Sequence, residues 1–277
     1  KDYYVTMLLR LLAQRMPYIV FKGGTSLSKC HKVIRRFSED IDITIDTLLS
    51  QGQKKKIKQA IVESAEELGM TIENLDETRS RRDYNRYVIA YDSVIPMASD
   101  ALKAAVLLET SYTAVSFPTV LLPVHSYIGD MMEQEAPDAI EEYNLNPFEM
   151  KVQGIDRTLA DKVFAVCDYY LQGKVAKHSR HLYDIYKLLP LVPQDENFKE
   201  LVKEVRAVRE QSVICPSALP EANVPELLEK IIKEKAYKQD YDSLTMQLLE
   251  ENVPYDTVIA ALKQIAGGAM FDNTYGG

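Results

Sequence analysis

The chain has 277 residues, a formal net charge of −8 and 46% hydrophobic residues. This length corresponds to one large domain or two modest ones, and the apolar content is ample for a core. The negative charge argues against a protein that coats nucleic acid in general, but it does not exclude a local basic groove. No apolar run reaches the length of a membrane span and no signal peptide is visible, so we expect no membrane partner.

Hydrophobic periodicity predicts an amphipathic helix at the start of the chain, over residues 2–16. A short strand, a glycine turn, a short helix and an acidic strand follow it. After them we expect one helix and then four strands, at residues 53–68, 70–75, 85–92, 102–113 and 119–124. From residue 156 to about 266 the pattern is helical, and we expect the Gly-rich tail from residue 267 to be loose.

These elements predict a mixed α/β (α+β) fold, in which a mixed sheet with helices precedes a helical C-terminal part. We place an α/β domain at residues 1–150 and a helical domain at residues 151–277, with the junction inside 136–152. Neither internal repeats nor low-complexity tracts interrupt this arrangement.

The cysteines indicate a reducing cellular compartment and do not suggest a metal site. Cys30, Cys167 and Cys215 are scattered without the spacing of metal ligands. An odd number of unpaired cysteines fits a reducing environment, so we expect buried structural thiols and a cytoplasmic protein. The four histidines show no metal spacing either.

A glycine turn stands between the first strand and the short helix. Residues 18–21 form the strand and residues 22–24, Lys-Gly-Gly, form the turn. Two glycines let the backbone approach a ligand closely and adopt positive φ. We expect Thr25 or Ser26 to cap the helix, which leaves backbone N–H groups free to meet an anion such as a phosphate.

An acidic strand follows the short helix. Residues 41–46, Ile-Asp-Ile-Thr-Ile-Asp, alternate apolar and polar side chains, as a half-buried strand does. Because side chains two apart share a face, one side carries Asp40, Asp42, Thr44 and Asp46, and the three isoleucines pack on the other. Two hard carboxylates on one face suit Mg²⁺ (or Mn²⁺), which shares its oxygen ligands with substrate phosphates. A metal pair of this kind activates an attacking hydroxyl and neutralises a departing pyrophosphate.

Each motif also has a simpler interpretation. A Gly-Gly turn before a helix is common, and Asp-x-Asp is compatible with the solvated face of an antiparallel sheet. A calcium loop that begins at Asp40 is excluded, because its sixth position is Ile45 instead of Gly and its twelfth is Gln51 instead of Glu. The two motifs together, in this order, are more specific than either alone and favour a nucleotide site.

The segments FKGGTSLSK, residues 21–29, and RRFSEDIDI, residues 35–43, resemble the AbiEii/AbiGii toxin family of nucleotidyltransferases. That family belongs to the DNA polymerase β-like superfamily, whose pattern is a Gly-Gly or Gly-Ser turn, a helix, and Asp-x-Asp on the next strand. The gap between the two motifs is at the long end of that pattern. The resemblance implies Asp40 and Asp42 as metal ligands and Ser26 as a phosphate contact.

Two later segments fit the same family. DRTLADKVFA, residues 156–165, resembles the family's helix with a Lys after a leucine–alanine–acid lead-in. RHLYDIYKL, residues 180–188, resembles its Arg-Asp-x-Tyr-Asp-Leu helix, with His181 where Asp is more usual. The resemblance implies Lys162 and Asp184 as further active-site residues.

Glu109 lies in the apolar segment AVLLETS, residues 105–111. An acidic residue in such a run is costly unless it is paired or bound to a metal. The superfamily usually has a third carboxylate on a neighbouring strand, and we expect Glu109 to be that ligand. The alternative is an edge strand on which Glu109 faces water.

Without the resemblance, Lys162, Arg180 and Asp184 have simpler roles. A lysine beside an apolar helix stripe is usually solvated, and Arg180 and Asp184, four apart on a helix, suit a plain ion pair. The resemblance instead implies that Lys162 contacts a triphosphate or an acidic partner and that Arg180 contacts phosphate or nucleic acid. Asp184 would then position Lys162 or act as a base.

The candidate site therefore has three groups of residues. The catalytic residues are Asp40, Asp42, Lys162 and Asp184. The nucleotide-binding residues are Gly23, Gly24, Thr25, Ser26, Lys29 and Arg180. The metal ligands are Asp40, Asp42 and Glu109.

A basic cluster beside two tyrosines is a candidate surface for a polynucleotide. Its members are Arg79, Arg81, Arg82 and Arg86, next to Tyr84 and Tyr87, and Arg35 and Arg36 add to it. Arginines can track a phosphate backbone and tyrosines can stack on bases. A charged loop between strands is the commoner explanation.

These observations predict a toxin-type nucleotidyltransferase that takes an NTP with Mg²⁺ or Mn²⁺. It would transfer the nucleotide to an acceptor hydroxyl, for which RNA such as tRNA is one candidate. The resemblance also implies an antitoxin protein as a partner. The alternatives are a non-catalytic nucleotide- or RNA-binding module of the same fold, against which the intact motifs speak, and transfer to a protein acceptor.

Overall fold

The computed structural model describes residues 1–38, 40–93, 104–115 and 117–272. The start of the strand predicted at 102–113 therefore lies outside the described residues. Within the described residues, no helix combines the length and apolarity needed to cross a membrane.

The chain divides into two compact units. The sheet unit contains residues 1–32 and 38–153, and the helical unit contains residues 33–37 and 154–277. The short segment 33–37 thus belongs to the helical unit, although it precedes the acidic strand in sequence.

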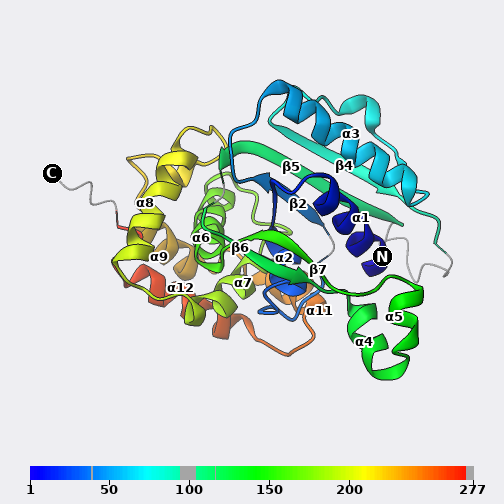
Figure 1. Ribbon diagram of the computed structural model, residues 1–277. Coiled ribbons are helices and arrows are strands. Elements are labelled where there is room, and N and C mark those ends of the chain that lie inside the picture. The colour runs from blue at the N-terminus through cyan, green and yellow to red at the C-terminus, as the bar shows by residue number, and fades with distance from the viewer. Residues whose placement is uncertain (39, 94–103, 116, 273–277) are drawn as a thin grey trace. The chain divides into compact units, whose positions relative to one another are not determined.

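The described part of the sheet unit contains one mixed sheet in the order β3-β4-β5-β2-β1-β7-β6 (Figure 1). The strands are β1 Ile19–Lys22, β2 Ile41–Ile45, β3 Thr71–Ile72, β4 Tyr84–Ala90, β5 Ala105–Val115, β6 Thr119–Val124 and β7 Phe148–Gln153. The helices are α1 Asp2–Arg15, α2 Gly23–Lys29, α3 Gln51–Glu67, α4 Tyr127–Glu135 and α5 Asp138–Glu142, with the 3-10 turn η1 Leu75–Glu77. Strand β2 is antiparallel to β1 and parallel to β5, and β1 is parallel to β7. This mixture of directions confirms the predicted mixed α/β fold class.

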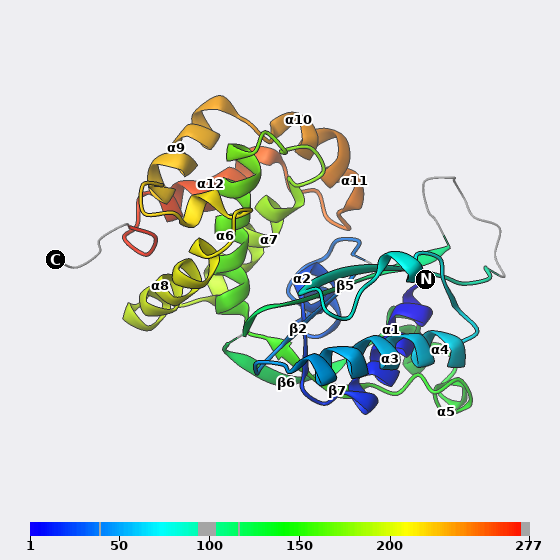
Figure 2. The same cartoon turned by 90° about the horizontal axis from the view of Figure 1, so that it is seen from above.

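One face of the sheet is covered by α1 and α3, which lie side by side (Figures 1 and 2). Ile41, Ile43 and Ile45 of β2 are at most 1% exposed and belong to this core. The predicted alternation is therefore confirmed for the isoleucines. Since successive side chains of a strand point to opposite faces, Asp42 lies on the face away from α1 and α3.

The segment 136–152, predicted as a junction, contains most of a strand. β7 is antiparallel to β6 and pairs in parallel with β1, where Phe21 stands opposite Val152. The sequence of β7, FEMKVQ, carries two charges in six residues and gives a weak strand signal. Its partner β1 is distant in sequence, so this pairing could be found only in the folded chain.

The helical unit confirms the helical pattern predicted for the C-terminal part. Its helices are α6 Ile155–Leu171, α7 Arg180–Leu188, α8 Glu196–Glu210, α9 Val224–Glu234, α10 Lys238–Asp240, α11 Met246–Leu248 and α12 Tyr255–Ala266, with the short turns η2 Leu189–Leu191, η3 Pro216–Ala218 and η4 Tyr241–Thr245. Helix α6 is central, and α7, α8 and α9 pack around it (Figure 2). Leu159, Val163 and Val166 of α6 expose no surface, as its apolar stripe requires.

Segment 33–37 joins the helical unit through its backbone. The amide of Phe37 donates to the carbonyl of Leu248 at 2.8 Å, and the amide of Glu250 donates to the carbonyl of Arg35 at 3.0 Å. Arg36 and Leu249 form an isolated antiparallel bridge between these bonds. The chain thus carries Arg36 into the helical unit before it returns to β2.

Candidate active site

The glycine turn is tighter than the sequence suggests. Gly23 has φ +80° and is already the first residue of α2, so the chain passes from β1 into the helix without a loop. The prediction that Thr25 or Ser26 caps this helix is wrong, because the N-cap residue is Lys22 and no side chain caps it. The positive φ of Gly23 makes the turn so short that Thr25 and Ser26 fall inside the helix.

Asp42 lies directly against this turn. A Cβ atom built on Gly23 would stand 2.0 Å from Oδ2 of Asp42, and Lys22 is the register partner of Asp42 on β1. Only glycine leaves room for this carboxylate, and its positive φ is strained for other residues. The glycine motif and the acidic strand therefore meet at one point, as their order in the sequence predicts.

Glu109 continues the acidic face across the sheet. It is the register partner of Asp42 on the parallel strand β5, and Arg86 of β4 stands opposite Glu109 on the other side. Directly opposed residues share a face, so Lys22, Asp42, Glu109 and Arg86 form a row across four strands. Strand β5 lies between β2 and β4, which excludes the alternative of an edge strand for Glu109.

The donor set of this row fits a hard divalent cation. Asp40 precedes β2 by one residue and, like Asp42 and Glu109, is only partly buried. Among the described residues, no group of three or more His, Cys, Asp or Glu side chains is close enough to hold a metal by itself. Mg²⁺ is usually held by one or two carboxylates and completes its shell with water and substrate phosphates. A two-carboxylate site next to a glycine turn matches that requirement.

The side chains of α2 are engaged within the protein. The Ser26 hydroxyl donates to the carbonyl of Gly23 at 2.9 Å, and the Thr25 and Ser38 hydroxyls are hydrogen-bonded at 2.9 Å. Ser26 exposes no surface and Thr25 exposes 1%. The residues of this turn that reach the surface are Lys22, Gly23 and Gly24. A phosphate contact by Ser26 or Thr25 remains a prediction.

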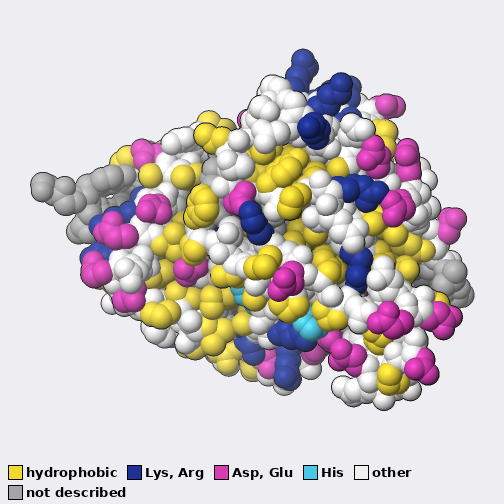
Figure 3. Space-filling view, in the orientation of Figure 1, with side chains coloured by type: hydrophobic (Ala, Val, Ile, Leu, Met, Phe, Trp, Pro, Cys, Tyr) yellow, Lys and Arg dark blue, Asp and Glu magenta, His cyan; other side chains and the backbone are white. Residues whose placement is uncertain are grey.

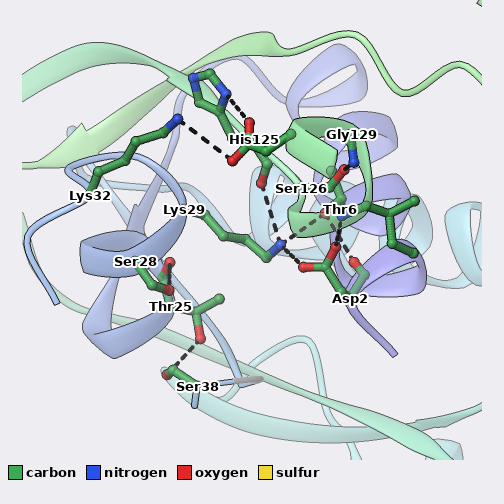
Figure 4. A network of polar contacts seen from close by, with 12 residues as sticks. Asp2, Thr6, Thr25, Ser28, Lys29, Lys32, Ser38, His125, Ser126 and Gly129 are labelled. Carbon is green, nitrogen blue, oxygen red and sulfur yellow. Dashed lines mark hydrogen bonds and ion pairs between the residues drawn. The ribbon is translucent and has the colours of Figure 1, made fainter. Parts of the chain in front are cut away.

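Lys29 also has protein partners. Its ammonium group forms an ion pair with Asp2 and donates to Thr6 Oγ1 at 3.1 Å and to the His125 carbonyl at 3.4 Å (Figure 4). The side chain is 3% exposed. These contacts join α2 to the start of α1 and to the end of β6, and they direct the ammonium away from the surface. Nucleotide binding by Lys29 remains a prediction.

Two residues of β4 lie at the end of the acidic row. The Arg86 Nε atom is 3.6 Å from Oε1 of Glu109. Burial, followed by the charge of Glu109, raises the pKa of Tyr84 to about 12. Glu109 therefore has a cation and a phenol as neighbours at this end of the row.

The basic residues of the sheet unit gather at the start of α3 and on the η1–β4 connection. Figure 3 shows Lys and Arg side chains clustered over the start of α3. On the connection, Arg79 donates to the carbonyl of Thr78 and Arg82 donates to that of Glu77, at 2.9 and 3.0 Å. Arg81 is exposed. These arginines thus keep their charge at the surface.

In the helical unit, Lys162 and Asp184 form one buried cluster with Arg36. The guanidinium of Arg36 binds both carboxylate oxygens of Asp184, at 2.6 and 2.7 Å, and Lys162 Nζ lies 2.6 Å from Asp184 Oδ2. Asp184 exposes no surface and Arg36 exposes 2%. The interpretation of Arg36 as a polynucleotide contact is therefore wrong, because the side chain is buried against Asp184.

Charge and burial act in opposite directions in this cluster. Burial alone would raise the pKa of Asp184, but the charges of Arg36 and Lys162 outweigh it and hold that pKa well below its usual range. Burial lowers the pKa of Lys162, against the attraction of Asp184. Asp184 therefore stays ionised and holds the two cations in place.

A sequence model of one family, described as nucleotidyl transferase AbiEii toxin of a type IV toxin–antitoxin system, matches residues 7–262. The chain belongs to the AbiEii family. It is a nucleotidyltransferase of the toxin type, and the resemblance seen in the sequence is confirmed. No curated protein matches the chain.

A solved structure gives the same fold for this AbiEii-family protein. MenT4, a nucleotidyltransferase toxin from Mycobacterium tuberculosis H37Rv, is similar with a TM-score of 0.50 and 14% sequence identity. The similarity covers 96% of this chain and 80% of that chain. At this identity the likeness shows the fold alone.

Sequence reasoning did not select Lys22 or Arg36 as site residues in this AbiEii-family protein. Lys22 directly precedes the two glycines, and its place opposite Asp42 follows once β1 and β2 are paired antiparallel. Arg36 lies in the segment RRFSEDIDI, but its contact with Asp184 had no local signal, because the two residues are 148 positions apart. Arg180 is on α7 with Asp184, but the ion-pair partners of Asp184 are Arg36 and Lys162. Asp184 is thus paired with residues of segment 33–37 and of α6 instead of with Arg180, four residues before it on α7.

Proposed function

We propose that this AbiEii-family protein transfers a nucleotide from an NTP to an acceptor hydroxyl in a reaction that depends on Mg²⁺ or Mn²⁺. In that reaction the acceptor oxygen bonds to the α-phosphorus while the bond to the pyrophosphate oxygen breaks, and the acceptor loses its proton. The observation that carries the proposal is the contact of Asp42 with the Gly23 turn. It combines a close backbone approach for phosphates with a carboxylate ligand at one place.

Asp40 and Asp42, with Glu109, would place two divalent cations, whose coordination shells would be completed by water and by the substrate phosphates. When bound, the cations supply charge neutralisation of the pyrophosphate and lower the pKa of the attacking hydroxyl. The protein's own contribution is to position the triphosphate, for which the backbone of Gly23 and Gly24 is accessible in the turn. Positioning and electrostatics carry most of the rate in phosphoryl transfer.

In the helical unit, we assign Lys162 and Arg180 to the triphosphate, with Asp184 as the residue that positions Lys162. This assignment rests on the family resemblance. The lowered pKa of Asp184 makes that carboxylate a weak base, which favours positioning over proton transfer.

The acceptor class that we propose is RNA, with a tRNA end as one candidate. The support is local charge: Arg79, Arg81, Arg82 and Arg86 are exposed on or next to the strand that ends the acidic row. Arginines in such a place neutralise phosphates of a polynucleotide backbone.

We further propose that an antitoxin protein restrains the activity in the cell. We also propose that the protein works in the cytoplasm, where its three buried free thiols suit the reducing conditions.

The test is transfer from NTPs labelled at the α-phosphate. Purified protein is incubated with each NTP, Mg²⁺ and total RNA or total protein. We expect labelled RNA from the wild type, a loss of at least about 100-fold in Asp42→Asn because a metal-ligating charge is gone, and no labelling with EDTA. The matched control is Asp46→Asn, at the far end of β2, where Asp46 pairs with Lys151. It should keep its activity.

The outcomes separate the competing functions. Full activity in Asp42→Asn would contradict the proposed mechanism. Label in protein instead of RNA would assign a protein acceptor, and NTP binding without any transfer would favour a binding module.

A further inference from the structure

Tyr84 is an exposed aromatic residue on the acidic face of the sheet. It lies at the start of β4 and is 51% exposed, whereas its neighbours Asn85 and Tyr87 are buried. The burial alternates along β4, so Tyr84 and Arg86 share the face that carries Asp42 and Glu109. A large apolar ring beside charged groups needs an explanation that the proposed chemistry does not yet give.

The ring of Tyr84 stands next to the acidic row. Its register partner is Ser111, and Glu109, two residues along β5, is its diagonal neighbour. Glu109 in turn lies 3.6 Å from Nε of Arg86. About half of the Tyr84 surface is open to solvent. A tyrosine has only two side-chain torsions, so it loses little conformational entropy when it stacks on a flat ligand.

The position of Tyr84 indicates which part of a nucleotide it meets. Strands β1, β2, β5 and β4 are consecutive in the sheet, so β4 lies three strand spacings, about 14 Å, from the strand that leads into Gly23. The triphosphate belongs at Gly23 and the carboxylates. Tyr84, at the other end of the row, is beyond the phosphates and on the same face.

We propose that the ring of Tyr84 stacks on a nucleobase at this end of the row. The proposal rests on the proposed function and adds a base-binding residue to it. Every base has a π-face, so an aromatic side chain binds it without requiring a particular sequence. The base belongs either to the NTP or to the end of the acceptor, and the chemistry of recognition is the same for both.

Steady-state kinetics of two substitutions separates the ring from the hydroxyl. Tyr84→Leu removes the ring, and we expect KM for the base-bearing substrate to rise roughly 5- to 100-fold, the range found for one stacked base. Tyr84→Phe keeps the ring and loses only the hydroxyl, so KM should stay near the wild-type value. The matched control is Tyr143→Leu, because Tyr143 is 55% exposed on the same unit. It should behave as the wild type.

The two sources of the base are told apart by which KM responds. A rise in KM for the NTP at saturating RNA assigns the base of the NTP. A rise in KM for RNA at saturating NTP assigns a base of the acceptor. Both results support the proposal.

A binding measurement without turnover is available because the chain contains no tryptophan. Tyr84→Trp in the Asp42→Asn background introduces a single indole at the proposed position. Titration with NTP, or with a short RNA, should quench its fluorescence in a saturable way, whereas Tyr143→Trp in the same background should show no quenching.

The proposal is overturned if Tyr84→Leu leaves both KM values unchanged while the wild type transfers nucleotide. It is also overturned if Tyr84→Phe raises KM as much as Tyr84→Leu, because the hydroxyl would then be the important group. If the wild type transfers no nucleotide, it is the proposed function that fails, and saturable quenching of the indole introduced by Tyr84→Trp would still support base binding.

Discussion

At the scale of single residues, the proposed site contains a glycine that has no room for a side chain. Gly23 has φ +80°, and a Cβ there would overlap Oδ2 of Asp42. Gly69 also has a positive φ, +65°, but a Cβ there would meet nothing within 4 Å. The two glycines therefore share a positive φ, and they differ in that only Gly23 has another residue, Asp42, at the position of a Cβ atom.

We predict that Gly23→Ala and Gly69→Ala both lower the free energy of unfolding, but that only Gly23→Ala abolishes transfer. Each variant carries the strain of an L-residue at positive φ, about 1–2 kcal/mol. In Gly23→Ala the carboxylate of Asp42 must also move. Urea unfolding and the labelled-NTP assay measure the two effects. Equal activity in both variants would show that the contact of Asp42 with the turn is unimportant.

At the scale of elements, buried charge joins parts of the helical unit. Arg36 comes from segment 33–37, Lys162 from α6 and Asp184 from α7. The contacts of Asp184 hold all three elements together. A buried ion cluster is sensitive to the loss of one member, because the remaining charges have no compensation.

We predict that Asp184→Asn destabilises the protein by about 3–5 kcal/mol, as expected when one partner of a buried ion pair is removed. The control is Asp242→Asn, which breaks the exposed pair with Lys238 and should have a much smaller effect, because solvent screens that pair. Urea unfolding at neutral pH measures both. Similar values for the two variants would contradict the role of the cluster.

The same substitution has a pH signature. The pKa of Asp184 is lowered by folding, so its contribution to stability is complete above the pKa of the unfolded chain, roughly 3.9, and is lost as pH falls through the folded value. The difference in unfolding free energy between wild type and Asp184→Asn should therefore be constant from pH 7 to 5 and should shrink below about pH 4. A difference that grows in acid would contradict this assignment.

At the scale of the whole molecule, charge is distributed unevenly. The net charge is −8, yet Arg79, Arg81, Arg82 and Arg86 are exposed within eight residues of one another. A polyanionic acceptor can bind such a protein only through a local basic surface, since the average field repels it. The affinity for RNA should therefore depend on salt and on these few side chains.

We predict that Arg81→Glu with Arg82→Glu raises KM for RNA, flattens its dependence on salt and leaves KM for the NTP unchanged. Each lost phosphate contact lowers the slope of log affinity against log salt by roughly 0.7 for a single strand. The control makes the same charge change on α9, at exposed Lys230 and Lys233. An identical effect of both variants would mean that only net charge matters.

The sequence by itself determined the chemistry and most of the elements. Glycines before a helix and carboxylates on an alternating strand are local patterns, because φ preferences and side-chain alternation act within a few residues. These patterns were enough to select Gly23, Asp42 and Glu109, to indicate the AbiEii family and to predict a mixed sheet followed by helices. The family match over residues 7–262 agrees with them.

Tertiary structure decided what depends on pairing between distant segments. The antiparallel pairing of β1 with β2 brings Gly23 against Asp42, and the position of β5 beside β2 puts Glu109 in register. The pairing of β7 with β1 and the contact of Arg36 with Asp184 had no local signal, because each joins residues more than 100 positions apart. Backbone hydrogen bonds and buried charges need partners that are close in space, whatever their distance in sequence. The strand pairings and the ion cluster can therefore be seen only in the folded chain.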